Sequence, residues 1–227
     1  MPGESVKDFY NRQYSFHAER GLACPNAVHD LKKALRRVAG VLRGFGIVGV
    51  GQGAEILDVG SGLGYYTKAL ASTGASVTGL DFSEVAVNAA RGTFPECRFV
   101  QGSWPDDAPA QSRFDVIWMV NFSLMNTFDV EFINRRLIAE SVKRLKPGGY
   151  LVVGWNSNFS GRTVDGYSHW SLSMLRKMQQ WCGLSPPLVT EVRLVSLSWF
   201  LVRAAYLRGR SVPIFMIYRK ESGSAPH

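Results

Sequence analysis

One stretch, in which a short apolar run meets three closely spaced glycines, constrains the fold of this chain most. Residues 55–59, Glu-Ile-Leu-Asp-Val, have the composition of a buried strand, and Gly60, Gly62 and Gly64 follow at once. Residues 67–72 are helix-forming. Because glycine lets the chain turn sharply and lets a ligand approach the backbone, the pattern predicts a strand, a binding turn and a helix.

The same alternation of strand and helix continues along the chain. We predict strands at residues 76–80, 97–101, 114–120 and 150–154. A helix capped by Ser83 is expected to run to Arg91, and another over residues 130–145 with Phe132, Ile133, Leu137, Ile138 and Val142 on one side. Strands and helices that alternate at this length imply a mostly parallel, right-handed α/β sheet.

Elements before and after this region complete the predicted fold. Asn26 can cap an amphipathic helix that ends at residue 44, with an apolar side of Val28, Leu31, Leu35, Val38 and Leu42. A helix is expected over residues 171–181, and strands 188–194 and 212–218 should pair antiparallel at one edge. The expected fold is a doubly wound, seven-stranded, mostly parallel α/β sheet with one antiparallel edge strand, helices on both faces and an N-terminal helical lid.

The length of 227 residues suits a single domain. We expect residues 1–45 to form the helical lid, residues 46–220 the core and residues 221–227 a flexible tail. The longest apolar stretch, residues 194–207, contains Ser196, Ser198 and Arg203 and is too short to span a bilayer. We interpret it as core, with a partner or peripheral membrane contact as the alternative.

Charge and cysteine content give weaker indications. The formal net charge is +8, from 26 Lys and Arg against 18 Asp and Glu, but no basic run forms an arm or tail. A solvated basic surface is favoured, and nucleic acid, an anionic substrate or an anionic membrane remain alternatives. Cys24, Cys97 and Cys182 are far apart and are expected to be reduced thiols. With no recognisable signal segment, we expect a cytoplasmic protein.

The glycine pattern also distinguishes between classes of cofactor. A dinucleotide fingerprint would have its third glycine where Tyr65 stands, so the pattern here is G-x-G-x-G. In this the chain resembles the class I S-adenosylmethionine-dependent methyltransferases, over residues 55–155 by motif. Residues 145–150, Leu-Lys-Pro-Gly-Gly-Tyr, match the turn from helix to strand in that family.

The resemblance implies a set of binding residues. Asp81 ends a strand about 20 residues past the first glycine, where an acid can accept hydrogen bonds from both ribose hydroxyls. At the position of Ser103, members of this family often carry an Asp that binds the adenine amino group. This chain has a serine there, so a different contact to the adenine is expected. The implied cofactor is S-adenosyl-L-methionine, with S-adenosyl-L-homocysteine as product, held by Asp58, Gly60, Ser61, Gly62, Gly64, Tyr65, Asp81, Phe82, Ser103, Trp104, Asn121 and Tyr14.

Candidates for the acceptor side lie elsewhere in the sequence. Methyl transfer is an in-line displacement that needs a well-placed nucleophile and no metal. His169, after the fifth strand, is the candidate general base for a hydroxyl acceptor, or alternatively caps the next helix. The lid carries polar and aromatic side chains that can reach the cofactor carboxylate or acceptor, or simply pack: Tyr10, Tyr14, His17, Arg20 and His29.

The nature of the acceptor is indicated mainly by what the sequence lacks. The loop at residues 121–124, Asn-Phe-Ser-Leu, has no Pro-Pro-aromatic motif of the kind found in methyltransferases that act on bases. We therefore expect a small-molecule acceptor, such as a sugar, an aromatic or polyketide-like product, or a lipid-linked metabolite. An RNA or nucleotide methyltransferase and a catalytically silent cofactor-binding partner protein are the alternatives. A homodimer is compatible with the sequence, which does not define the oligomeric state.

Overall fold

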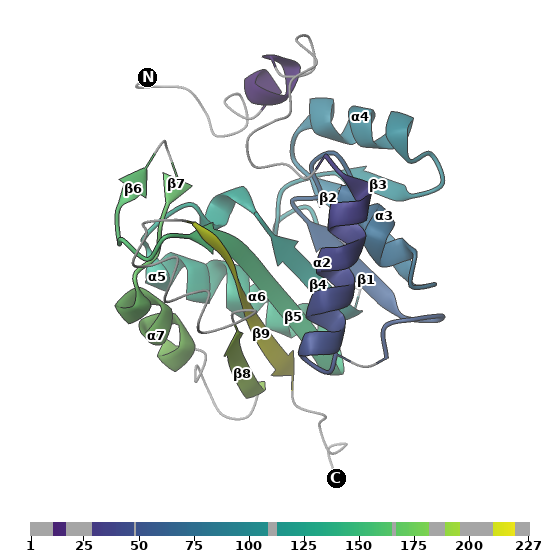
Figure 1. Ribbon diagram of the computed structural model, residues 1–227. Coiled ribbons are helices and arrows are strands. Elements are labelled where there is room, and N and C mark those ends of the chain that lie inside the picture. Colours follow the sequence, from purple (N-terminus) through teal and green to yellow (C-terminus); the bar gives the residue numbers. More distant parts are fainter. Residues whose placement is uncertain are drawn as a thin grey trace. The chain divides into compact units, whose positions relative to one another are not determined.

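The computed structural model describes residues 11–16, 29–47, 49–108, 113–164, 167–181, 189–195 and 211–220 (Figure 1). The chain forms two compact units, residues 1–112 and 113–227. Several predicted features lie outside the described residues: the cap at Asn26, the lid residues Tyr10, His17 and Arg20, most of the 194–207 stretch, and the tail. No helix within the described ranges is long and apolar enough to cross a membrane.

The first unit contains the predicted repeat of strand and helix. Three strands, β1 (Glu55–Val59), β2 (Ser76–Asp81) and β3 (Arg98–Gln101), pair in parallel in the order β3-β2-β1. Helix α3 (Tyr65–Ala71) joins β1 to β2, and α4 (Glu84–Thr93) joins β2 to β3. The hydroxyl of Ser83 accepts a 3.2 Å hydrogen bond from the amide of Ala86, so the predicted cap of α4 is confirmed.

Helix α2 (Leu31–Gly44) differs from its prediction in both its start and its buried face. Asp30, not Asn26, caps it by accepting a 3.2 Å hydrogen bond from the amide of Lys33. The side that faces the interior consists of Ala34, Val38 and Val41. Leu35, predicted to be buried, is 37% exposed. Of the predicted apolar side, Val38 is buried and Leu31 and Leu42 are half-buried, and α2 contacts α3.

Four of the described strands in the second unit pair side by side in the order β4-β5-β9-β8. These are β4 (Phe114–Val120), β5 (Leu145–Ser157), β9 (Val212–Lys220) and β8 (Val189–Val195). β4 and β5 run parallel, and β9 is antiparallel to both β5 and β8, which confirms the predicted antiparallel pair at this edge. The centre of β9 is fully apolar apart from a tyrosine hydroxyl and is buried, as the strand pattern predicts.

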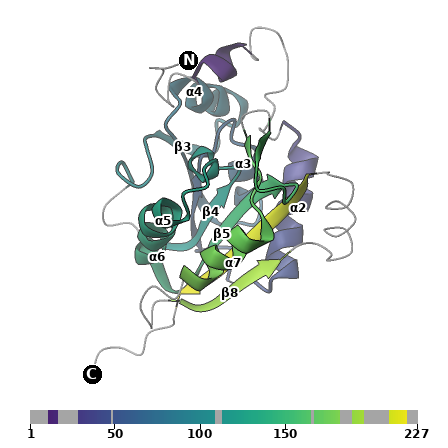
Figure 2. The same cartoon turned by 90° about the vertical axis from the view of Figure 1, so that its left-hand side faces the viewer.

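The helix predicted over residues 130–145 is present as three consecutive segments. They are α5 (Val130–Phe132), the π-helix η2 (Ile133–Ile138) and α6 (Ala139–Arg144). The predicted apolar side is buried except at Phe132, which is 38% exposed. Helix α7 (Leu172–Trp181) packs against α5 (Figure 2). A two-stranded hairpin, β6 (Thr163–Val164) and β7 (Tyr167–Ser168), precedes it and was not predicted.

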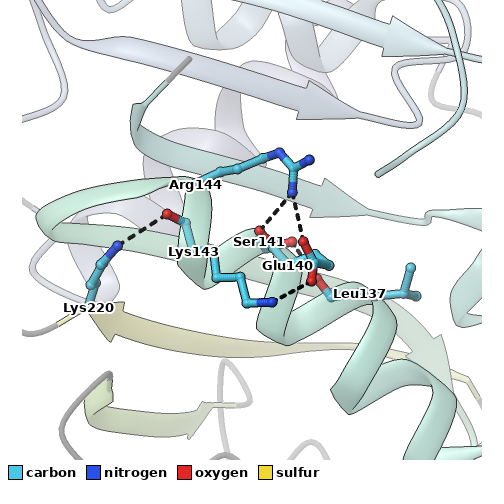
Figure 3. A network of polar contacts seen from close by, with 6 residues as sticks. All are labelled: Leu137, Glu140, Ser141, Lys143, Arg144 and Lys220. Carbon is cyan, nitrogen blue, oxygen red and sulfur yellow. Dashed lines mark hydrogen bonds and ion pairs between the residues drawn. The ribbon is translucent and has the colours of Figure 1, made fainter. Parts of the chain in front are cut away.

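Polar contacts close the carboxyl end of α6 (Figure 3). Nζ of Lys220, the last residue of β9, donates to the carbonyl oxygens of Lys143 at 3.3 Å and Leu145 at 2.8 Å. Glu140 binds the side chains of Lys143 at 2.7 Å and Arg144 at 3.0 Å. A cation placed on the last carbonyls of a helix satisfies acceptors that the helix leaves unpaired. These contacts fix the turn into β5.

Candidate functional site

The glycine turn after β1 is fastened to the end of β2. The amides of Gly60 and Ser61 both donate to the carbonyl oxygen of Leu80, at 2.8 and 3.1 Å. The amide of Gly62 donates to Oδ2 of Asp81 at 2.9 Å. Three successive backbone donors therefore bind the carboxyl end of the neighbouring strand, which is the edge of an α/β sheet where ligands bind.

The glycines of the turn serve different purposes. Gly62 has φ +50°, and a Cβ there would stand 2.8 Å from the hydroxyl oxygen of Tyr14. Gly64 has φ +82°, and a Cβ there would stand 2.5 Å from the ring of Phe99 and 3.1 Å from Ala90. Gly64 thus lets the start of α3 approach Phe99 and Ala90 closely. The absence of a side chain at Gly62 leaves space that the Tyr14 hydroxyl occupies.

Asp81 is the central polar residue of this turn. Only 6% of it is exposed, and its carboxylate accepts two backbone hydrogen bonds, from Gly62 at 2.9 Å and from Ser83 at 2.8 Å. Burial raises the pKa of Asp81, and the bonds from Ser83 and Gly62 oppose that rise. Within the described residues Asp81 forms no ion pair. Its carboxylate oxygens keep lone pairs that can accept from a ligand.

A second buried acid lies on the adjacent strand. Asp58 is 1% exposed and pairs in register with Gly79 of β2. Its Oδ2 accepts a 2.6 Å hydrogen bond from the hydroxyl of Thr67. Burial raises the pKa of Asp58 to about 7, the Thr67 bond opposes this, and the nearby Asp81 adds to it.

The two acids and the turn fit the cofactor that the sequence implies. Neither Asp58 nor Asp81 has a cationic partner among the described residues, so this region favours a ligand that carries positive charge and hydroxyl donors. Oγ of Ser61 is buried and has no hydrogen-bond partner in the described part of the chain. A buried hydroxyl of this kind is normally satisfied by a ligand or water.

Residues 11–16 form a short helix that is attached to this turn. Oγ of Ser83 donates to Oδ1 of Asn11 at 2.6 Å. One turn further on, Tyr14 reaches Gly62. Residues 11–16 of the predicted lid therefore contact the glycine turn and the β2–α4 connection.

Tyr65, predicted as a cofactor residue, has a packing role in this structure. Its ring meets Phe94 edge to face, with centroids 5.2 Å apart, and lies 6.3 Å from the ring of His29. Phe82, predicted to lie on the adenine, is half-buried beside Asp81 at the end of β2.

The turn that follows β3 contains an acid that the sequence analysis missed, Asp107. Ser103 is exposed, and its amide donates to Oδ2 of Asp107 at 2.8 Å, while the amide of Asp107 donates back to the carbonyl of Ser103 at 2.8 Å. The tight turn thus brings a carboxylate beside Ser103. The available signal was an acid four residues after the position where the family often has one. Trp104, 4% exposed, follows Ser103 and precedes a cis proline.

Two predicted residues, Asn121 and His169, belong to the second unit. Asn121 directly follows β4 with φ +59°, and its amide donates to the carbonyl of Gly154 at 2.7 Å. A left-handed non-glycine residue at a strand end stores backbone strain of the kind found at functional sites. The side chain is half-buried.

His169 follows the β6–β7 hairpin. Its Nδ1 accepts a 3.2 Å hydrogen bond from the amide of Asn158, and its own amide donates to the carbonyl of Arg162 at 3.0 Å. An Nδ1 that accepts leaves the proton of the neutral ring on Nε2. His169 does not cap α7, because the hydroxyl of Ser171 accepts from the amide of Met174 at 3.3 Å.

Buried tryptophans adjoin this region of the second unit. Trp155, near the end of β5, packs edge to face on Trp170 with centroids 5.8 Å apart. Oγ of Ser157 donates to the carbonyl of Trp170 at 2.9 Å, which holds the segment before α7 against the strand. This buried aromatic pair therefore packs the segment before α7 onto the carboxyl end of β5.

Comparison with solved structures identifies the fold. The [4+2]-cyclase SpnF superposes with a TM-score of 0.66 at 17% identity, with 96% of each chain covered. Phosphoethanolamine N-methyltransferase 2 of Haemonchus contortus superposes with a TM-score of 0.68 at 13% identity, covering 97% of this chain and 61% of that one. A S-adenosylmethionine-dependent methyltransferase of Clostridium acetobutylicum gives 0.60 at 13% identity, covering 95% and 100%. The fold is that of the class I S-adenosylmethionine-dependent methyltransferases.

Sequence comparison finds similarity over part of the chain. Residues 56–149 match the family described as methyltransferase domain. Demethylmenaquinone methyltransferase of Tropheryma whipplei is 39% identical over 111 residues, 47% of this chain and 44% of that protein. Trans-aconitate 2-methyltransferase of Delftia acidovorans is 35% identical over 116 residues, 49% and 41%. The matched region spans less than half the length of either relative.

These findings confirm the predicted family resemblance and the α/β fold class. Residues 56–149 match the methyltransferase domain family, and the cofactor of the class I fold is S-adenosylmethionine, which the similar Haemonchus contortus structure holds. The matched region begins in β1 and includes the glycine turn, Asp81 and the Pro-Gly-Gly turn, which are the features on which the resemblance depended.

Proposed function

We propose that this chain is a S-adenosylmethionine-dependent methyltransferase that methylates a small-molecule acceptor at oxygen or nitrogen. The observation that carries this proposal is the buried Asp81 carboxylate, which two backbone amides hold at the glycine turn and which forms no ion pair with a described residue. An ionisable group kept buried without a countercharge is a mark of a binding site.

Each residue of the turn has a proposed role toward the cofactor. Asp81 accepts hydrogen bonds from the ribose hydroxyls, since each of its oxygens keeps a lone pair. Asp58 favours the cationic end of the ligand electrostatically, and Oγ of Ser61 provides a polar contact. When bound, S-adenosylmethionine supplies a methyl group activated by a positively charged sulfur.

We further propose that Asp107 replaces the acid that Ser103 lacks. Its Oδ2 is fixed by the amide of Ser103 at 2.8 Å, so the carboxylate lies at the end of β3, where an acceptor for the adenine amino group is expected. Only one oxygen of Asp107 takes part in that bond. The other can accept from an exocyclic amine.

Two lines of support favour a small acceptor over nucleic acid. Both curated relatives are named for small molecules, demethylmenaquinone and trans-aconitate. The 121–124 loop has no Pro-Pro-aromatic motif. For the acceptor we propose polar contacts to Asn121 and His169 of the second unit.

The cofactor site is tested by calorimetric titration of the chain with S-adenosylhomocysteine. Wild type is expected to bind in the micromolar range, and Asp81→Ala to bind about 100-fold more weakly, because a buried charge-assisted contact is lost. Glu96→Gln is the control: it removes an exposed acid that pairs with Lys68 away from the turn, and it should bind like wild type. Failure of wild type to bind would contradict the proposal.

The acceptor class is tested next with methyl-labelled cofactor. Reaction mixtures containing quinols, phenols and small carboxylic acids are compared with mixtures containing total RNA. Label transfer to a small molecule supports the proposal. Cofactor binding with transfer to RNA alone would overturn its acceptor class, and binding without transfer to any acceptor would favour the silent partner protein.

A further inference from the structure

Helix α2 carries an uneven distribution of charge. Five of its fourteen residues are basic, and the acid nearest to them in sequence, Asp30, caps the helix. Arg37 is half-buried and donates to the hydroxyl of Tyr66 at 2.7 Å. The other four cations are exposed: Lys32, Lys33, Arg36 and Arg43.

The exposed cations have no acidic partner in the described part of the chain. The ion pairs found there involve other residues. Nε of Arg36 and Nε of Arg43 each donate to a carbonyl one turn back, at 3.4 and 3.3 Å. These bonds hold the two side chains along the helix, and no described acid pairs with their terminal nitrogens, which suit an anion.

A row of leucines runs beside the cations. Leu31, Leu35 and Leu42 each precede one of the basic residues, Lys32, Arg36 and Arg43, by one position. At about 100° per residue, the two rows therefore lie side by side along the helix. Leu35 is 37% exposed, and Leu31 and Leu42 are half-buried. At the same spacing the leucine row lies between the cations and the buried face of Ala34, Val38 and Val41, which holds α2 against its own unit.

We propose that α2 docks this protein on an anionic membrane surface. In this arrangement the row of Lys32, Arg36 and Arg43 meets lipid phosphates while Leu35 and its neighbours enter the boundary between headgroups and acyl chains. The cations alone would suit nucleic acid equally well. The exposed Leu35 decides for lipid, because an exposed apolar side chain gains free energy where it leaves water.

The proposal is tested with the full chain and phospholipid vesicles by cosedimentation, without cofactor, so that its outcome is separate from that of the proposed methyl transfer. Vesicles of phosphatidylcholine containing phosphatidylglycerol are expected to bind the chain, and vesicles of phosphatidylcholine alone are not. Added salt should weaken the binding, because exposed charges are screened. Absence of binding to the anionic vesicles at low salt would overturn the proposal.

A charge-matched pair of variants locates the surface. The triple variant Lys32→Ala/Arg36→Ala/Arg43→Ala should bind anionic vesicles at least about tenfold more weakly. The control removes three exposed cations elsewhere, Arg98→Ala/Arg176→Ala/Lys177→Ala, and should bind like wild type. Equal loss in both variants would mean that net charge, not α2, attracts the membrane, and would contradict the proposal.

The variant Leu35→Ser distinguishes lipid from nucleic acid. It changes an exposed side chain, so the helix should stay folded, which the melting temperature checks. It is expected to weaken vesicle binding and to leave any weak binding to a polyuridine RNA unchanged. Vesicle binding that is insensitive to Leu35→Ser, together with RNA binding that the triple variant abolishes, would assign α2 to nucleic acid instead.

Discussion

The hydroxyl of Thr67, in the first turn of α3, donates a 2.6 Å hydrogen bond to Oδ2 of Asp58, in β1. Burial nevertheless outweighs this bond and raises the pKa of Asp58 from 3.8 to about 7. Between these two pH values the unfolded chain is ionised while the folded chain keeps the proton, so the contribution of Asp58 to stability falls as pH rises through this window. Above the pKa of the folded state, the whole free-energy cost of ionising the buried Asp58 carboxyl group lowers stability.

We expect Asp58→Asn to stabilise the free protein at alkaline pH, because an amide can accept the Thr67 bond without charge. Relative to wild type, its free energy of unfolding should rise by about 2 kcal/mol between about pH 5 and about pH 8. The same variant should weaken binding of S-adenosylmethionine, which carries positive charge. Chemical denaturation at the two pH values measures the first effect. A stability difference that does not change with pH would show that Asp58 titrates normally.

The turn itself could be predicted from the sequence because its information is local. The run from residue 55 to residue 64 specifies a strand followed by backbone that only glycine adopts easily, and β1 and β4 have the predicted bounds. The cap of α4 at Ser83 is equally local. The place of Asp81 at the site could be predicted from its position at the end of a strand. Its carboxylate accepts a hydrogen bond from the glycine turn.

Features that depend on packing could not be predicted in the same way. Periodicity showed that α2 is amphipathic, but not that Ala34 would be the residue against the interior instead of Leu35. The two-residue strands of β6 and β7 are too short to carry a periodic signal. The approach of Asp107 to Ser103 depends on the geometry of one turn, which residue types alone do not determine.

Gly62 and Tyr14 provide a test of the contact between residues 11–16 and the glycine turn. Gly62→Ala should lower both stability and affinity for S-adenosylhomocysteine, because the new Cβ would stand 2.8 Å from the Tyr14 hydroxyl oxygen. Tyr14→Phe removes that oxygen and leaves the ring carbon Cζ at 3.7 Å, an ordinary contact. In a double-mutant cycle of unfolding free energies, the double variant should therefore regain about 1 kcal/mol of stability. Simple additivity would indicate that Tyr14 does not occupy this place.

Gly64 is expected to matter for folding more than for binding. Gly64→Ala combines φ +82° with a Cβ placed 2.5 Å from the Phe99 ring, so it should destabilise the chain by about 3 kcal/mol. Gly92→Ala is the matched control, because it lies in α4 with no atom within 4 Å of the added Cβ. That substitution should be neutral or slightly stabilising. Equal stability of the two variants in urea unfolding would contradict the packing role of Gly64.

Asp107 is tested through the adenine amino group. S-inosylhomocysteine has an oxygen in place of that amine, so wild type should bind it at least about tenfold more weakly than S-adenosylhomocysteine. Asp107→Asn keeps an oxygen for the Ser103 amide but can donate to the inosine oxygen, and should largely remove the discrimination. Asp106→Asn, at the exposed neighbouring acid, should discriminate like wild type. Unchanged discrimination in Asp107→Asn would leave that residue a turn-forming role only.

His169 allows a base to be distinguished from a hydrogen-bond donor. Because Nδ1 accepts from the amide of Asn158 at 3.2 Å, the neutral ring carries its proton on Nε2 and can donate there, but it cannot take up a proton at that atom. We therefore expect His169→Asn to lower kcat by less than about tenfold and to preserve the shape of the pH–rate profile, whereas loss of a general base costs about 100-fold or more. Steady-state kinetics across neutral pH make the measurement. A larger loss, accompanied by disappearance of an ionisation from the profile of kcat/KM, would instead establish His169 as the base and require its bond to Asn158 to break during turnover.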